Sequence, residues 1–124
     1  MLPQLSAAVR VFLCTKPTDM RKSFDGLSGL VQECFGADLL TGHLFLFLNR
    51  RRDRIKILYF DRDGLAIWYK RLEVGCFQRV EATPGAAQLA GAAGIELSVT
   101  DLALILGGVD LTTARRRERY SRVG

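Results

Sequence analysis

The clearest structural signal in the chain is HLFLFLNRRRDRIKILYFDRDGLAIWYKRLE, residues 43–73. It contains three runs rich in β-branched, aromatic and other apolar residues, and two polar segments of hairpin length separate them. The second polar segment holds Asp63-Gly64, a dipeptide that is typical of tight hairpin turns. The pattern therefore predicts successive antiparallel strands at 43–49, 54–60 and 65–73.

The second run indicates which side chains share a face. Alternate side chains of a strand point to opposite sides, so Ile55, Ile57 and Tyr59 are expected on one side of the sheet. On the other side we expect Arg54, Lys56, Leu58 and Phe60. The run CFQRV at 76–80 follows a Val-Gly turn and is a candidate fourth strand. Together these runs predict a three- or four-stranded antiparallel β-meander.

A strand and a helix are expected upstream of the meander. VRVFLC at 9–14 is a short β-rich run and is predicted to join the sheet as an edge strand. A helix is predicted over 19–35, with Thr18 and Asp19 capping its start and Gly36 ending it. Its apolar residues recur at helical spacing, so the helix is amphipathic and should pack on one face of the sheet. These residues are Met20, Phe24, Leu27, Leu30, Val31 and Cys34.

Downstream of the meander, IELSV at 95–99 is predicted to form a short strand or an extended arm. Thr100-Asp101 then caps a short C-terminal helix at 101–107, which is expected to close one end of the domain. The fold class is therefore α+β, in a single domain that spans residues 1–111. Residues 112–124 have almost no apolar content and are expected to form a disordered basic tail.

Composition limits the classes of function. The 124 residues are 48% hydrophobic and 25% charged, as in a globular protein of one domain. Cys14, Cys34 and Cys76 are far apart in the sequence and form no CxxC pair, which favours reduced thiols over disulfides or a zinc site. No apolar run approaches the ~18 residues that span a membrane. With no signal-peptide pattern, we expect a cytoplasmic protein, associated with the nucleoid if it binds DNA.

Motifs for catalysis are absent from the sequence. It holds no phosphate-binding glycine loop, no HExxH and no GxSxG, and His43 has no Cys or carboxylate placed beside it. Asp61 and Asp63 could hold Mg²⁺, but Asp-x-Asp-Gly between two strands is also what a hairpin turn requires, and the turn is the favoured interpretation. We therefore expect a protein that is not an enzyme and that uses no metal and no cofactor.

Positive charge is concentrated in two short segments. The formal net charge is +5. The segment RRRDRIK at 50–56 carries five positive charges and one negative, and residues 115–124 carry five arginines and one glutamate. Such clustering is expected of a surface that binds an anionic partner. The alternative is that the positive charge only keeps the protein soluble and binds no specific partner.

The basic hairpin is the candidate contact with DNA. A turn projects several arginines together, and their forked donors match phosphate oxygens, unless Asp53 neutralises them in a solvated turn. Trp68 and Tyr69 face opposite sides of their strand, so at most one belongs to the core. The other is a candidate for base stacking or for a protein-partner surface. The candidate nucleic-acid-binding residues are Arg50, Arg51, Arg52, Arg54, Lys56, Lys70, Arg71, Arg115, Arg116 and Arg117.

Three segments of the chain resemble a known family, in the same order. Residues 42–77 resemble the core of the TnpB-type accessory proteins encoded by the sixty-six family of bacterial insertion sequences. KPTDMRKSFDGL at 16–27 is similar to that family's entry into its first helix, and IELSVTDLALILGGVDL at 95–111 to its closing segment. Two features depart from the family: Leu111 stands where an aromatic residue is common, and the tail at 112–124 is unlike the usual short endings.

The resemblance implies a role in DNA transposition. Proteins of this family are encoded beside a separate transposase and have no catalytic residues to carry over. We therefore predict a non-catalytic accessory protein that binds DNA weakly, mostly through the backbone, and docks the transposase and the other accessory product of the same element. The alternative is a protein–protein adaptor without DNA contact, which would use the surface around Trp68 or a sheet edge.

Overall fold

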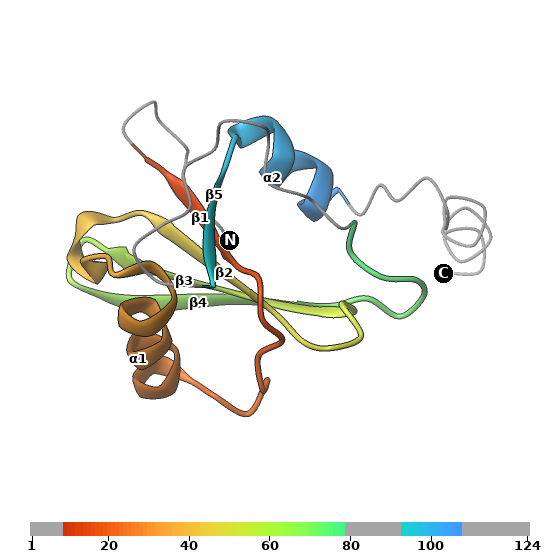
Figure 1. Ribbon diagram of the computed structural model, residues 1–124, viewed down its shortest axis with the longest axis horizontal. Helices are drawn as coiled ribbons and strands as arrows, with labels where there is room; N and C mark the ends of the chain where they lie inside the picture. Colours follow the sequence, from red (N-terminus) through yellow and green to blue (C-terminus); the bar gives the residue numbers. More distant parts are fainter. Residues whose placement is uncertain (1–8, 79–92, 108–124) are drawn as a thin grey trace.

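The computed structural model describes residues 9–78 and 93–107, which form a five-stranded sheet and two α-helices (Figure 1). The tail predicted at 112–124 lies outside the described residues. In chain order the elements are β1 (Val11–Cys14), α1 (Phe24–Phe35), the short 3₁₀ helix η1 (Leu39–Thr41), β2 (Leu44–Leu48), β3 (Arg54–Asp61), β4 (Gly64–Arg71), β5 (Gly94–Leu97) and α2 (Val99–Leu106).

The predicted meander is present as β2, β3 and β4, which pair antiparallel in sequence order. The turn between β3 and β4 lies at Arg62 and Asp63, between the paired residues Asp61 and Gly64. Arg62 adopts the left-handed backbone conformation, with φ 56°, although glycine is the residue that usually takes it. The backbone N–H of Asp63 donates to the carbonyl of Asp61 at 2.5 Å, so these two aspartates belong to a tight turn, as predicted.

The sheet extends beyond the meander and is mixed. Its strand order is β4-β3-β2-β1-β5, with β1 parallel to β2 and antiparallel to β5. The prediction that residues 9–14 form an edge strand is wrong, because β1 lies between two other strands and all four of its residues are buried. A parallel pair needs a long crossover connection, and α1 lies in the connection from β1 to β2. The strand expected at 95–99 is confirmed as β5.

The fourth strand expected at 76–80 does not form in the described residues, which end at 78 in this segment. Instead, the backbone N–H of Phe77 donates to the carbonyl of Arg52 at 2.6 Å, and that of Leu72 to the carbonyl of Asp53 at 2.7 Å. The chain after β4 therefore folds back over the hairpin between β2 and β3. Complete burial of the Phe77 side chain stabilises this path, because an aromatic ring removes a large apolar area from water.

Both faces of the sheet are buried, each against a different helix. On one face Phe45 and Phe47 pack with Leu27 of α1. On the other face Ile57 packs in the cluster that includes Leu102 of α2. Figure 1 shows the two helices on opposite sides of the sheet. α2 packs on the face opposite α1, next to β5 at one edge of the sheet.

α1 begins at Phe24, later than the start predicted at residue 19. Asp19 closes a turn of its own, since its Oδ1 accepts the N–H of Arg21 at 2.9 Å and its carbonyl accepts the N–H of Lys22 at 3.1 Å. Phe24 consequently lies in the first helical turn and is 44% exposed, although the spacing placed it on the buried face. The helix ends at Gly36, as predicted, with the left-handed φ of 56° that glycine adopts at little cost.

α2 confirms the predicted short C-terminal helix and begins slightly earlier, at Val99. The Ser98 hydroxyl accepts the N–H of Asp101 at 3.0 Å, and the Asp101 carboxylate accepts the N–H of Ser98 at 3.3 Å. This reciprocal pair is a capping box, so Asp101 lies inside the first turn and Ser98 is the cap. No helix in the described part of the chain combines the length and apolar character needed to cross a membrane.

Candidate nucleic-acid interface

The hairpin between β2 and β3 presents Arg50 and Arg51 to solvent. Asn49 shapes the turn, because its Oδ1 accepts the backbone N–H groups of Asp53 at 3.1 Å and of Arg54 at 3.0 Å. Its Nδ2 donates to the Asp53 carboxylate at 2.6 Å. Asp53 is therefore bonded to an amide, and within residues 9–78 and 93–107 no hydrogen bond or ion pair holds the guanidinium group of Arg50 or Arg51.

Arg52 lies in the same turn, but its side chain is directed toward Cys76 and not toward solvent like those of Arg50 and Arg51. Its backbone is left-handed, with φ 58°, and its Nη2 donates to the Sγ of Cys76 at 3.7 Å. Its Nη1 is buried and has no partner among the described residues. The Arg52 side chain thus lies against the segment that follows β4, and it is less available to a partner than Arg50 or Arg51.

Lys56 is buried, although it was a predicted DNA contact. Only 8% of it is exposed, and its Nζ donates to the backbone carbonyls of Met20 at 2.8 Å and of Lys22 at 2.7 Å. The ammonium group also lies 4.8 Å from the ring centroid of Tyr69, which is a cation–π distance. Lys56 therefore binds the loop before α1 to the sheet, and its charge is out of reach of a DNA backbone.

Anchored in this way, the loop before α1 brings Arg21 beside the hairpin. Arg21 forms an ion pair with Asp19, with Nη2 and Oδ2 2.7 Å apart. The side-chain hydrogen bonds from Arg21, and then the one from its backbone N–H, lower the pKa of Asp19 to about 2. The loop and the hairpin together line an open groove of about 490 Å³. Its lining residues are Thr18, Asp19, Met20, Arg21, Asn49, Arg50, Arg51, Asp53 and Arg54.

A second hollow, of about 320 Å³, adjoins this groove through their shared residue Arg54. Arg54 and Arg71 lie directly opposite each other on β3 and β4. The Nη1 of Arg54 donates to the hydroxyl of Tyr69 at 3.5 Å, and the Nη2 of Arg71 donates to Glu73 at 2.8 Å. The hollow is lined by these four residues, so the face of the sheet that carries α1 continues into a basic surface at this end.

Trp68 and Lys70 lie on the other face of β4. Trp68 packs against the core cluster on the face opposite α1, whereas Tyr69 is 47% exposed, which agrees with the expectation that at most one of them is a core residue. Lys70 lies opposite the buried Ile55, which belongs to the same core. Of the two predicted basic residues at 70 and 71, only Arg71 therefore lies on the face with the groove.

The remaining predicted residues either lie outside the described residues or lie away from this surface. The candidates Arg115, Arg116 and Arg117 lie outside the described residues. Asp61 and Asp63 occupy the turn at the opposite end of β3 from Arg54. Arg21 is the residue of the groove that sequence reasoning missed, because its position depends on the Lys56 anchor and on no local motif.

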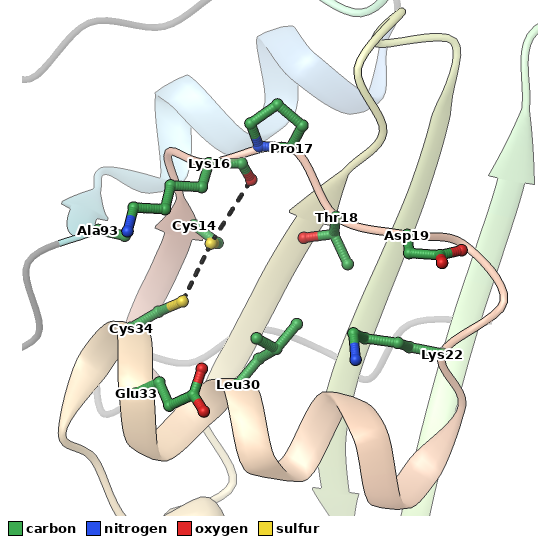
Figure 2. A pocket seen from close by; sticks show the side chains of 10 residues that line it. All are labelled: Cys14, Lys16, Pro17, Thr18, Asp19, Lys22, Leu30, Glu33, Cys34 and Ala93. Carbon is green, nitrogen blue, oxygen red and sulfur yellow. Dashed lines mark hydrogen bonds between the residues drawn. The ribbon is translucent and has the colours of Figure 1, made fainter.

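A separate pocket, of about 180 Å³, lies between the end of β1 and α1 (Figure 2). Here the Sγ atoms of Cys14 and Cys34, which are far apart in the sequence, lie 3.2 Å from each other. Both cysteines are free and buried, and burial, with the hydrogen bond to Cys14, raises the pKa of Cys34 to about 12. Cys34 is therefore a poor nucleophile at neutral pH. No cluster of three or more His, Cys, Asp or Glu that could hold a metal occurs among the described residues.

The sequence of this small α+β protein matches a known family and two related proteins. The family model described as "IS66 Orf2 like protein" matches residues 9–116. Two uncharacterized proteins of Sinorhizobium fredii (strain NBRC 101917 / NGR234) are similar: y4hO is 34% identical over 124 residues, 100% of both chains, and y4jC is 30% identical over 112 residues, 90% of this chain and 89% of the relative. No solved structure gives a significant match. The chain therefore belongs to the IS66 Orf2-like family of transposition accessory proteins, which are generally non-catalytic.

Proposed function

We propose that this accessory protein binds the DNA backbone through five arginines, termed here the arginine surface: Arg21, Arg50, Arg51, Arg54 and Arg71. Guanidinium groups offer paired donors that match phosphate oxygens, and contacts of this kind carry no base sequence. The binding is therefore largely independent of sequence and sensitive to salt. It takes place in the cytoplasm, at the nucleoid.

The opposed pair Arg54 and Arg71 is the observation that carries this proposal. Like charges directly across an antiparallel pair weaken a sheet, and an anion bound beside the pair would offset this repulsion. Glu73 supplies one to Arg71, whereas the guanidinium group of Arg54 donates only to the neutral hydroxyl of Tyr69 among the described residues. A phosphate held between the two guanidinium groups would accept hydrogen bonds from both.

The carboxylates of this surface explain why the proposed binding is weak. Asp19, Asp53 and Glu73 line the same two hollows as the five arginines. Asp19 and Glu73 each hold one arginine in an ion pair that a phosphate must replace. The net charge of the surface remains positive, but part of the attraction to DNA is offset by these internal pairs.

A second contact, with the transposase and the other accessory product of the element, belongs to the same proposal. β4 is an eight-residue strand at one edge of the sheet, and a partner strand could pair with its outer side. The adaptor alternative uses this edge, next to Trp68 and Tyr69, without DNA. Co-purification of the element's transposase from a nuclease-treated co-expression lysate, lost when a proline replaces Ile67, would support this edge as the docking surface. The same result combined with no DNA binding at low salt would favour the adaptor.

We also propose that the chain itself performs no catalysis. The general character of the family supports this, and so does the chemistry of the surface, which offers phosphate-binding cations and no paired acid and base. In this account the separately encoded transposase carries out strand transfer, and the present chain contributes contacts with DNA and protein.

Fluorescence anisotropy with a labelled duplex tests the DNA contact. We compare an element-end duplex with a scrambled one, and the wild-type protein with an Arg50→Gln/Arg51→Gln variant. Its matched control, Arg62→Gln/Lys70→Gln, removes the same charge away from the arginine surface. We expect similar affinity for both duplexes, and the slope of log K against log salt should become shallower by about 2 only in the first variant.

Two results of this experiment would count against the proposal. Absence of binding at low salt removes the DNA contact and leaves the adaptor as the better account. An equal loss in the two variants shows that net charge alone, and no defined surface, attracts DNA.

A further inference from the structure

We infer that the hollow around Tyr69 binds an unpaired base of single-stranded DNA, stacked on the tyrosine ring, with the adjoining phosphate on Arg54 and Arg71. The inference rests on the proposed function, because it assigns a substrate class to one part of the arginine surface. It adds a discrimination between single strands and duplexes that backbone contacts alone do not provide.

The orientation of the Tyr69 ring makes it a stacking platform. The Lys56 ammonium lies 4.8 Å from the ring centroid, and Lys56 is itself 8% exposed, so that side of the ring is turned to the interior. Tyr69 is 47% exposed, and its accessible part must therefore be turned away from Lys56. An aromatic ring beside a positively charged groove is the arrangement by which proteins stack the bases of single strands.

The ring is also held in place before any ligand arrives. Tyr69 lies directly opposite Lys56 in the strand register, and its hydroxyl accepts a hydrogen bond from Arg54 at 3.5 Å. Arg71 follows two residues later on the same face, roughly 7 Å further along the strand. A base on the ring therefore has two guanidinium groups within reach of its flanking phosphate.

The size of the hollow favours one base over a base pair. At about 320 Å³ it is near the lower end of small-ligand sites. A base within a duplex is covered on both faces by its neighbours, so it cannot lie on the tyrosine ring unless it leaves the stack. Single strands, frayed ends and flipped bases meet this condition, and intact duplexes do not.

Glu73 provides an internal competitor for the phosphate. The Nε and Nη2 of Arg71 donate to the same carboxylate oxygen of Glu73, at 3.0 and 2.8 Å. Both side chains are about half exposed, so the pair can open without unfolding the strand. Neutralising Glu73 should therefore release Arg71 and increase affinity for single strands.

The test is an anisotropy titration of the full chain with a labelled oligothymidylate and with a labelled duplex. Tyr69→Leu should weaken binding of the oligothymidylate by about 5- to 100-fold and leave duplex binding within about twofold. Tyr69→Phe, which keeps the ring, should retain binding of the single strand. Glu73→Gln is a second variant that leaves the ring untouched, and it should strengthen oligothymidylate binding.

The outcomes separate this inference from the proposed function. If the duplex binds through Arg50 and Arg51 but Tyr69→Leu changes both ligands equally or neither, the inference fails and the proposed function stands. The same holds if Tyr69→Phe loses as much affinity as Tyr69→Leu. If the wild-type protein binds neither DNA, both fail.

Discussion

At the scale of single residues, Lys56 connects the core to the surface. Its ammonium donates hydrogen bonds to two backbone carbonyls of the loop before α1 and lies against the Tyr69 ring. It therefore positions both Arg21 and Tyr69 without touching a ligand. A buried lysine is costly unless its charge is hydrogen bonded, and here both carbonyl bonds meet that need.

Replacing Lys56 should therefore affect stability first. We expect Lys56→Met to lower the free energy of unfolding by about 2 kcal/mol, because bonds to a charged group contribute more than neutral ones. Urea unfolding measures this change. Lys70→Met is the matched control on the other face of the sheet, and it should stay within about 0.5 kcal/mol of the wild type. Equal effects of the two substitutions would show that Lys56 is no anchor.

His43 should make stability depend on pH. Its Nδ1 accepts the backbone N–H of Arg10 at 3.0 Å, and burial, together with the charge of Arg10, lowers its pKa despite the opposing charge of Glu96. The unfolded chain then takes up the proton at a higher pH than the folded one. The free energy of unfolding should therefore fall as the pH falls through about 6.5.

The pH effect can be assigned because the sequence has a single histidine. His43→Asn retains an acceptor for the Arg10 N–H and removes the titrating group. Urea unfolding at a series of pH values should show a shallower decline between about pH 7 and 5 in this variant. An unchanged pH profile would mean that other groups cause the decline.

At the scale of elements, the contact between α1 and β5 depends on one glycine. A Cβ added to Gly94 would overlap the backbone carbonyl of Cys34 and lie 2.5 Å from Cδ1 of Phe35. These atoms belong to the end of a packed helix and cannot move freely. Backbone approach this close is a position that only glycine fits.

A matched pair of substitutions tests this contact. Gly94→Ala should destabilise the protein by about 1–3 kcal/mol, as overpacking does. Gly29→Ala in α1 has open space around the new methyl group and should stabilise by up to ~1 kcal/mol, because alanine favours helix more than glycine does. Thermal unfolding of both variants measures the difference, and a neutral Gly94→Ala would disprove the close packing.

The elements also differ in how well the sequence predicts them. The meander of β2, β3 and β4 follows from local patterns, since consecutive strands are joined by short turns. The interior position of β1 does not, because it depends on pairing with β2 and β5, which are distant in the chain. The pattern predicts the start of α1 too early, because Thr18 and Asp19 are as well suited to a turn as to a helix cap.

At the scale of the whole molecule, the proposed site is a product of topology. The hairpin arginines Arg50 and Arg51 could be found from the sequence because they are neighbours in a polar turn. The alternation of β3 also predicted that Arg54 and Lys56 share a face, but it did not show that Lys56 is buried beneath a loop. Arg21 lies on the same surface because that loop packs beside the hairpin. No local sequence pattern predicts this contact between the loop and the hairpin.

The position of the DNA contact can be measured directly. We would record amide chemical shifts of the ¹⁵N-labelled protein during titration with a short duplex at low salt. The account predicts that shifts concentrate in the loop before α1, the hairpin between β2 and β3, and the end of β4 around Arg71. The turn at Arg62 and the exposed side of α2 should remain unchanged. Shifts centred on that turn or on α2, or no shifts at all, would contradict the arginine surface as the DNA-binding site.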